Sequence, residues 1–183
     1  LLNKIRDNHV DQEVLNELNK RYIPDFDPDS GGGYITLTTH NSQANTINDS
    51  KLQKLPGRTH SFSAIIKDEF PELSYPNASE LILKTGAQVM FVKNDLSGNK
   101  LFFNGKIGKV VSFEEDVIVV KCPGDDFPIR VEMVEWQNVK YTLDEETKEI
   151  AETVMGTFTQ YPVKLAWAIT IHKSQGLTFD RAV

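Results

Sequence analysis

A change of sequence pattern near residue 86 limits the folds open to this 183-residue chain. Before it, a β-type run is followed by a helical pattern. After it, five short runs rich in β-branched residues follow one another, separated by turn signals. These runs cover residues 87–92, 107–113, 117–121, 129–134 and 139–143. The sequence therefore predicts an α/β domain interrupted by a small antiparallel β-barrel.

The part before residue 86 contains a strand, a polar turn and a helix in direct succession. Residues 34–39 are rich in β-branched and aromatic side chains, and residues 44–55 place apolar side chains at helical spacing before a Pro-Gly pair. Polar residues 40–42 lie between them. Such a turn lies between the carboxyl end of a strand and the N-terminus of a helix. The sheets of α/β proteins bind their ligands at the carboxyl ends of strands, and the unpaired amides of a helix N-terminus favour anions.

The N-terminal region is predicted to be a separate helix and a linker. Residues 10–22 have an amphipathic helical pattern, with Asp11 placed as the N-cap. Residues 23–33 are rich in Pro, Asp and Gly, so they are interpreted as a linker at a domain boundary. The chain starts without Met and stops at Val183 as a new apolar run begins. We therefore expect it to be a fragment of a longer protein.

The closing segment, residues 161–176, is apolar through Ile169 and then becomes abruptly polar. Periodicity alone does not decide between a strand and a buried helix. A shared helical face favours a helix starting near Leu165. The residues on that face are Leu165, Ala168, Ile169 and His172. Residues 179–183 are then expected to begin the next strand.

The polar end of this segment brings several ligand-binding groups to one place. They are the hydroxyls of Thr170 and Ser174, the imidazole of His172, the ammonium of Lys173, the amide of Gln175 and the backbone of Gly176. Hydrogen-bond donors of this kind, ending on a glycine that permits close approach, suit oxygen-rich anionic ligands. The alternative is a helix end with ordinary polar capping.

Composition excludes several classes of protein. The chain has 26 Asp and Glu against 20 Lys and Arg, a net charge of −6, so a uniformly basic nucleic-acid coat is impossible although a local patch is allowed. Cys122 is the only cysteine, which excludes an internal disulfide and fits a reducing compartment, the cytoplasm. No apolar run approaches the roughly 20 residues of a membrane span, so no membrane partner is expected.

Residues 165–176 resemble motif V of superfamily 1 DNA helicases, in the RecD-like branch that includes the petite-integration-frequency (PIF-type) helicases. Two further stretches agree with that branch in order. Residues 37–41 with Ile47-Asn48 resemble its motif IV region, and residues 86–94 with 104–110 resemble the junction into its inserted barrel. The opening helix with Ile5-Arg6 is similar to the tail of the preceding ATPase domain.

The resemblance implies an α/β fold of the P-loop NTPase type. A RecA-like half-motor domain is expected from residues 28–93 plus 161–183. A small SH3-like β-barrel is expected as an insertion over residues 94–160. Residues 1–27 are expected to be the tail helix of the preceding ATPase domain and a linker.

The resemblance also implies the roles of individual residues. The expected DNA contacts are Thr39, His40 and Asn41 in one loop and Thr170, His172, Lys173 and Ser174 in the other. Gln175 and Gly176 are expected to face the nucleotide. Thr178 stands where some superfamily 1 motors carry a Glu, so the contact of that Glu to the nucleotide is not expected here.

The implied activity is translocation on single-stranded DNA and duplex unwinding, driven by ATP hydrolysis. ATP and Mg²⁺ are the expected cofactors of the full-length protein. The expected partners are single-stranded DNA and a missing N-terminal ATPase domain of the same chain, and the protein is expected to be a monomer. The rival interpretation is a non-enzymatic module whose β-barrel recruits a protein partner.

The chain by itself is expected to be catalytically silent and to bind no cofactor. A Walker A loop requires Gly-x-x-x-x-Gly-Lys-Ser/Thr, but Gly105-Lys106 is followed by Ile107. Motif VI, with its arginine finger, is also missing. Residues 65–69 resemble a magnesium-binding Asp-Glu box but are interpreted as surface charge. Trp136 and Phe103 are interpreted as core aromatics rather than base-stacking platforms.

Overall fold

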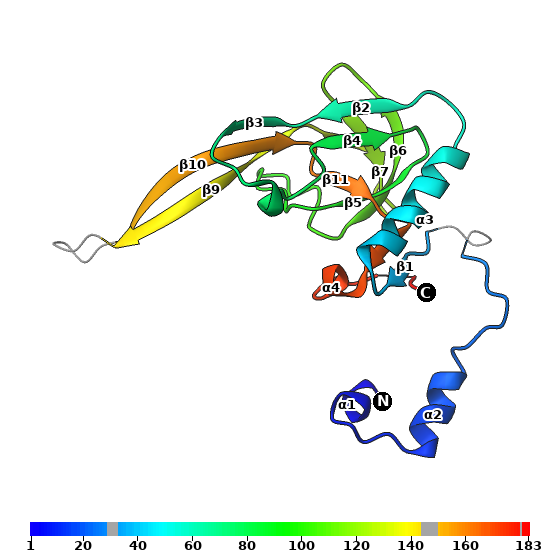
Figure 1. The fold of residues 1–183 in the computed structure, drawn as a ribbon. Coiled ribbons are helices and arrows are strands. Elements are labelled where there is room, and N and C mark those ends of the chain that lie inside the picture. Colours follow the sequence, from blue (N-terminus) through cyan, green and yellow to red (C-terminus); the bar gives the residue numbers. More distant parts are fainter. Residues whose placement is uncertain (29–32, 144–149, 180) are drawn as a thin grey trace. The chain divides into compact units, whose positions relative to one another are not determined.

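The computed structural model describes residues 1–28, 33–143, 150–179 and 181–183. The chain forms two compact units, Leu1–Gly32 and Gly33–Val183, whose elements are drawn in Figure 1. Residues 29–32 of the expected linker and Asp180 of the expected last strand lie outside the described residues. Among the helices that are described, none is long and apolar enough to cross a membrane.

The first unit contains two short helices, α1 (Leu2–Arg6) and α2 (Gln12–Asn19). Asp11 is the N-cap of α2, as predicted. Its carboxylate accepts a hydrogen bond from the Val14 amide at 2.8 Å. That bond is the main reason why the pKa of Asp11 lies below its usual value. Val14 is buried, as the amphipathic pattern predicts.

The second unit is a mixed α/β fold in which a pair of parallel strands joins distant parts of the sequence. β1 (Thr36–Thr38) pairs with β12 (Ala168–Thr170). An isolated parallel bridge from Ile35 to Ala182 lies beside this pair, in the region of the expected last strand. α3 (Asn41–Lys54) follows β1 (Figure 1), as the strand-turn-helix pattern predicts. It packs on both strands of the parallel pair.

The prediction of a helix starting near Leu165 is wrong. The apolar run forms two short strands, β11 (Val163–Leu165) and β12, and α4 (Ile171–Ser174) begins only at the polar end. All three residues of β12 are buried, and the Thr36 amide donates to the Trp167 carbonyl at 2.8 Å. A short buried strand has the same unbroken apolar run as a buried helix, so the sequence pattern did not separate them.

Predicted β runs and β11 combine in one antiparallel sheet of five strands, in the order β11-β5-β6-β7-β8. The remaining strands are β5 (Gln88–Phe91), β6 (Ile107–Phe113), β7 (Ile118–Lys121) and β8 (Ile129–Val131). The described sheets are open, and the closed SH3-like barrel is not confirmed. The reason is that the next strand, β9 (Val134–Leu143), does not pair with this sheet but with β10 (Ile150–Gln160).

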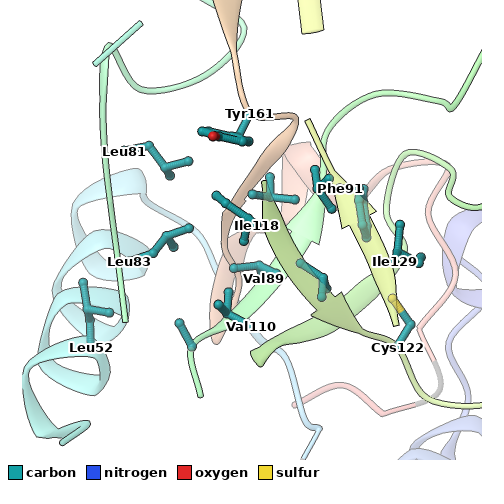
Figure 2. Packing of buried hydrophobic residues seen from close by; sticks show 14 residues of the cluster. Leu52, Leu81, Leu83, Val89, Phe91, Val110, Ile118, Cys122, Ile129 and Tyr161 are labelled. Atoms are coloured by element: carbon teal, nitrogen blue, oxygen red, sulfur yellow. The ribbon is translucent and has the colours of Figure 1, made fainter. Parts of the chain in front are cut away.

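The main core lies on this five-stranded sheet. Figure 2 shows its buried side chains, which come from α3, from β4 (Glu80–Leu83) and from the sheet itself. Phe91 stacks on Phe102 with 4.3 Å between ring centroids. Burial raises the pKa of the Cys122 thiol to about 11, so the thiol stays protonated at neutral pH.

A second antiparallel sheet contains β3 (Ile65–Asp68), β9 (Val134–Leu143) and β10 (Ile150–Gln160), and β9 and β10 extend from it as a two-stranded ribbon (Figure 1). The register shifts at Gly156, where a Cβ atom would lie 2.6 Å from the backbone of Glu69. Only glycine permits this close approach.

The region between residues 58 and 83 contributes β2 (His60–Ser63), β3, a short 3₁₀ helix (Glu72–Ser74) and β4. Every residue of β3 is exposed, which confirms the surface interpretation of that charged stretch. Phe103 is 58% exposed, so its expected place in the core is wrong. Trp136 is partly buried, with the Lys93 ammonium 4.9 Å from its ring centroid.

Candidate functional site

Two loops meet at one edge of the parallel pair β1 and β12. Thr38, the last residue of β1, lies opposite Thr170, the last residue of β12. Because the strands are parallel, the residues that follow them leave the pair at the same edge. The structure therefore brings the expected DNA contacts of residues 39–41 next to those of residues 170–174, although about 130 residues separate them in sequence.

The first loop presents its polar groups to solvent at the start of α3. Thr39, His40 and Asn41 are all exposed. The Thr39 hydroxyl is hydrogen-bonded to the His40 ring nitrogen Nδ1 at 2.8 Å. His40 is the N-cap of α3, and its side chain makes no capping hydrogen bond. The loop thus combines exposed donors with a helix N-terminus, which favours negatively charged groups.

Two buried polar residues hold this loop against β12. The Thr38 hydroxyl lies 3.2 Å from the His40 carbonyl and 3.4 Å from the Ile169 carbonyl, to which it can donate. The Asn48 side chain donates to the Ala168 carbonyl at 2.9 Å and accepts from the Ala168 amide at 2.9 Å. Asn48 is only 8% exposed, so both bonds lie inside the protein.

Thr38 and Asn48 received no role of their own from the sequence. A signal for Asn48 was present, because Ala44, Asn48 and Leu52 are spaced by four residues and form the buried face of α3. A polar residue on an apolar helix face indicates a buried hydrogen-bonding partner. That partner, β12, could not be identified from local sequence.

The second loop divides the other expected contacts into two groups. His172 and Lys173 are exposed on α4. Thr170 is buried at the N-cap of α4, and Ser174 is partly buried with its hydroxyl donating to the Ile171 carbonyl at 2.7 Å. The imidazole and the ammonium are thus the groups of this loop that are most available to a ligand.

The expected nucleotide-facing residues follow directly. Gln175 is exposed, and Gly176 has a φ of 76° with no atom within 4 Å of where a Cβ would lie. Leu177 anchors the stretch after them, because it packs on Gly105 so closely that a Cβ there would lie 2.7 Å from the leucine Cδ2. The exposed turn is therefore tied to the loop between β5 and β6.

Lysine side chains add positive charge beside the loops. A groove of about 860 Å³ is lined by Asn41, Thr170 and Lys173 together with Lys164 on β11. Burial, followed by the charge of Lys173, lowers the pKa of Lys164 to about 8. Asp49 and Glu80 also line the groove. The lysine ammonium groups and the neutral donors at the loop end of the groove suit phosphate oxygens.

Several known proteins with a similar sequence or fold carry the name Pif1. No family model matches the chain. The "ATP-dependent DNA helicase PIF1" of Rattus norvegicus is 38% identical over 150 residues, which cover 79% of this chain and 22% of that protein. The chain thus spans about a fifth of the length of that curated relative.

Two solved structures extend the similarity to nearly the whole chain. Pif1 from a Bacteroides species in complex with ADP-AlF4 aligns with a TM-score of 0.87 and 38% identity over 99% of this chain and 40% of that one. Bacteroides Pif1 bound to single-stranded DNA aligns with a TM-score of 0.71 at the same 38% identity, again over 99% and 40% of the two chains.

Proposed function

This chain belongs to the Pif1 branch of the superfamily 1B DNA helicases, and from that premise we propose that it forms one half of the motor of an ATP-dependent DNA helicase. The half-motor couples ATP hydrolysis to translocation on single-stranded DNA and to duplex unwinding. The observation that carries the proposal is the meeting of two exposed loops at the carboxyl ends of β1 and β12. The Bacteroides Pif1 that shares this fold is bound to single-stranded DNA in one of its structures.

In this function the loop pair grips the sugar-phosphate backbone. His40, His172 and Lys173 are exposed nitrogen groups, and Thr39 and Asn41 add a hydroxyl and an amide beside the N-terminus of α3. Such groups hold phosphates without reading the bases. A motor that steps along any sequence requires this kind of contact.

The finer domain organisation is also part of the proposal. Residues 28–93 and 161–183 form the second RecA-like domain, and residues 94–160 form a module related to the SH3-like barrel. β5 and β11, from the first set of segments, share a sheet with β6, β7 and β8 from the second. We take this shared sheet as the rigid junction between motor and module.

Gln175 and Gly176 fit one side of a nucleotide site. The Gln175 amide is exposed, and the left-handed backbone at Gly176 leaves open space for close approach. Both groups are neutral, so they suit sugar and phosphate oxygens but do not balance the charge of ATP and Mg²⁺. We assign the phosphate loop and the Mg²⁺ ligands to an ATPase domain outside this chain. Bound ATP supplies the free energy that drives each step.

The test is a titration of a fluorescein-labelled oligothymidine with the 183-residue chain, followed by fluorescence anisotropy at low and at physiological salt. We expect weak binding that falls steeply as the salt concentration rises. For a single strand, each phosphate contact should add about −0.7 to the slope of log K against the logarithm of the salt concentration. Tight binding that ignores salt would instead indicate a self-contained recognition module. No binding even at low salt would contradict the role of the loop pair.

A further inference from the structure

The groove beside the loop pair continues well beyond the residues discussed so far. One wall is a face of α3, and the other consists of residues 75–78, β4 and residues 164–170. Its volume is about 860 Å³. Because Asn41, Thr170 and Lys173 line it, the groove is continuous with the proposed DNA contacts.

Lys164 is the unusual residue of this groove. Its side chain is partly buried, and among the described residues no ion pair joins its ammonium to a carboxylate. A lysine with little exposure is usually paired with a carboxylate, as Lys106 is: its ammonium lies 2.7 Å from the Asp125 carboxylate. Burial lowers the pKa of Lys164, and the charge of another cation, Lys173, lowers it further.

The other titratable groups of the groove do not neutralise Lys164. Asp49 on α3 and Glu80 on β4 are exposed, and neither contributes to the shift in the pKa of Lys164. Lys84 donates from its ammonium to the Leu55 carbonyl at 2.8 Å. Tyr75, which also lines the groove, packs its ring on Phe158.

Burial costs the Lys164 ammonium part of its hydration, and the charge of the exposed Lys173 repels it. An oxyanion placed between the two ammonium groups would offset this repulsion and accept hydrogen bonds from both. A nucleic-acid strand carries such groups at regular intervals, so a strand held at the loop pair presents its next phosphates to the adjoining groove.

We propose that the groove along α3 holds a phosphate of the bound single strand between Lys164 and Lys173. This inference rests on the proposed function, and it adds Lys164 as a contact and gives the strand a path away from the loop pair. Two observations favour a nucleic-acid strand as the occupant: the groove is continuous with Asn41, Thr170 and Lys173, and among the described residues no carboxylate pairs with Lys164.

The experiment compares Lys164→Met with Lys67→Met on the 183-residue chain. Methionine keeps the apolar part of the side chain and removes the charge. Lys67 lies on exposed β3, outside the groove, and its loss changes the net charge equally. Oligothymidine binding is measured over a range of salt concentrations, and thermal unfolding checks that each variant folds.

We expect Lys164→Met to weaken oligothymidine binding roughly tenfold, as for one charge-assisted hydrogen bond. The slope of log K against the logarithm of the salt concentration should become shallower by about 0.7, the value for one lost phosphate contact. Lys67→Met should change neither quantity. Because the anion requires the ammonium form, binding by the unmodified chain should weaken as the pH rises through the Lys164 pKa near 8, and Lys164→Met should lose this pH dependence.

Each other outcome overturns the inference in a distinguishable way. If the unmodified chain binds DNA and a folded Lys164→Met binds equally well, the groove assignment is wrong while the proposed function stands. If the unmodified chain binds no DNA, both are wrong. Poly-glutamate and inorganic phosphate serve as competitors of oligothymidine, compared at equal concentrations of negative charge. If either one competes through Lys164 as effectively as DNA does, the groove is a general anion site and not part of a DNA path.

Discussion

The five-stranded sheet and the parallel pair β1–β12 are stabilised in different ways. The sheet carries a cluster of fourteen buried side chains, drawn in Figure 2. The parallel pair is associated with a small buried cluster of four residues, and Thr38 and Asn48 supply hydrogen bonds between its segments. Stability is thus concentrated in the sheet, whereas the geometry of the candidate site depends on a few polar bonds. Substitutions in the two regions should therefore have different consequences.

The largest effect is expected in the core of the sheet. Phe91 is fully buried and stacks on Phe102, so Phe91→Ala removes a large side chain and leaves a cavity. The free energy of unfolding should fall by about 3–5 kcal/mol. Denaturant titration followed by circular dichroism measures this change. A loss below about 1 kcal/mol would show that stability is not concentrated in this sheet.

Asn48→Ala should affect both stability and binding. It removes both side-chain bonds to Ala168 and leaves the two backbone groups without that partner. The expected cost is about 2 kcal/mol, since a buried polar group without a partner costs about 1–3 kcal/mol. DNA affinity should fall as well, because the two loops lose their fixed relative position.

The matched control is Ser50→Ala, an exposed position on the same helix. It should leave unfolding and DNA binding close to those of the unmodified chain. If Asn48→Ala lowers stability while DNA affinity per folded molecule is unchanged, the side chain only stabilises the fold and does not position the loops.

Several elements could be predicted from sequence because their signals are local. The β-branched runs gave β5, β6 and β7 nearly to the residue, and Asp11 marked the start of α2. The helix expected near Leu165 failed because an apolar run has the same appearance in a buried strand and in a buried helix. Pairing with β1, which decides between them, is a contact over about 130 residues.

The candidate site shows the same limit. The polar residues of both loops were identified by their chemistry and by family resemblance, but their exposure was not. Sequence treated Thr170, His172 and Ser174 alike, whereas the structure buries Thr170, exposes His172 and engages the Ser174 hydroxyl. Lys164 gave no signal, because the groove that makes it unusual is assembled from separate segments.

His172→Ala should weaken DNA binding without destabilising the fold. His172 is exposed, so little packing is lost. One hydrogen bond to a charged phosphate is worth about 1.5–3 kcal/mol, which corresponds to a ten- to hundredfold loss of affinity for every sequence tested. Anisotropy with oligonucleotides of different sequence and a melting curve on the same preparation check both parts. A sharp fall in melting temperature with unchanged affinity would assign His172 a purely structural role.

Ser174→Ala should have the smallest effect, although it lies two residues from His172 in the same loop. A serine hydroxyl has one proton, and in the structure that proton is donated to the Ile171 carbonyl at 2.7 Å. It is therefore not available to a phosphate unless the local bond breaks, and the net loss of DNA affinity should be about 0.5 kcal/mol or less. Titrating Ser174→Ala and His172→Ala side by side measures the difference directly. An equal loss for both variants would mean that the hydroxyl turns from Ile171 to the DNA on binding, and that the loop changes its hydrogen bonding when the strand enters.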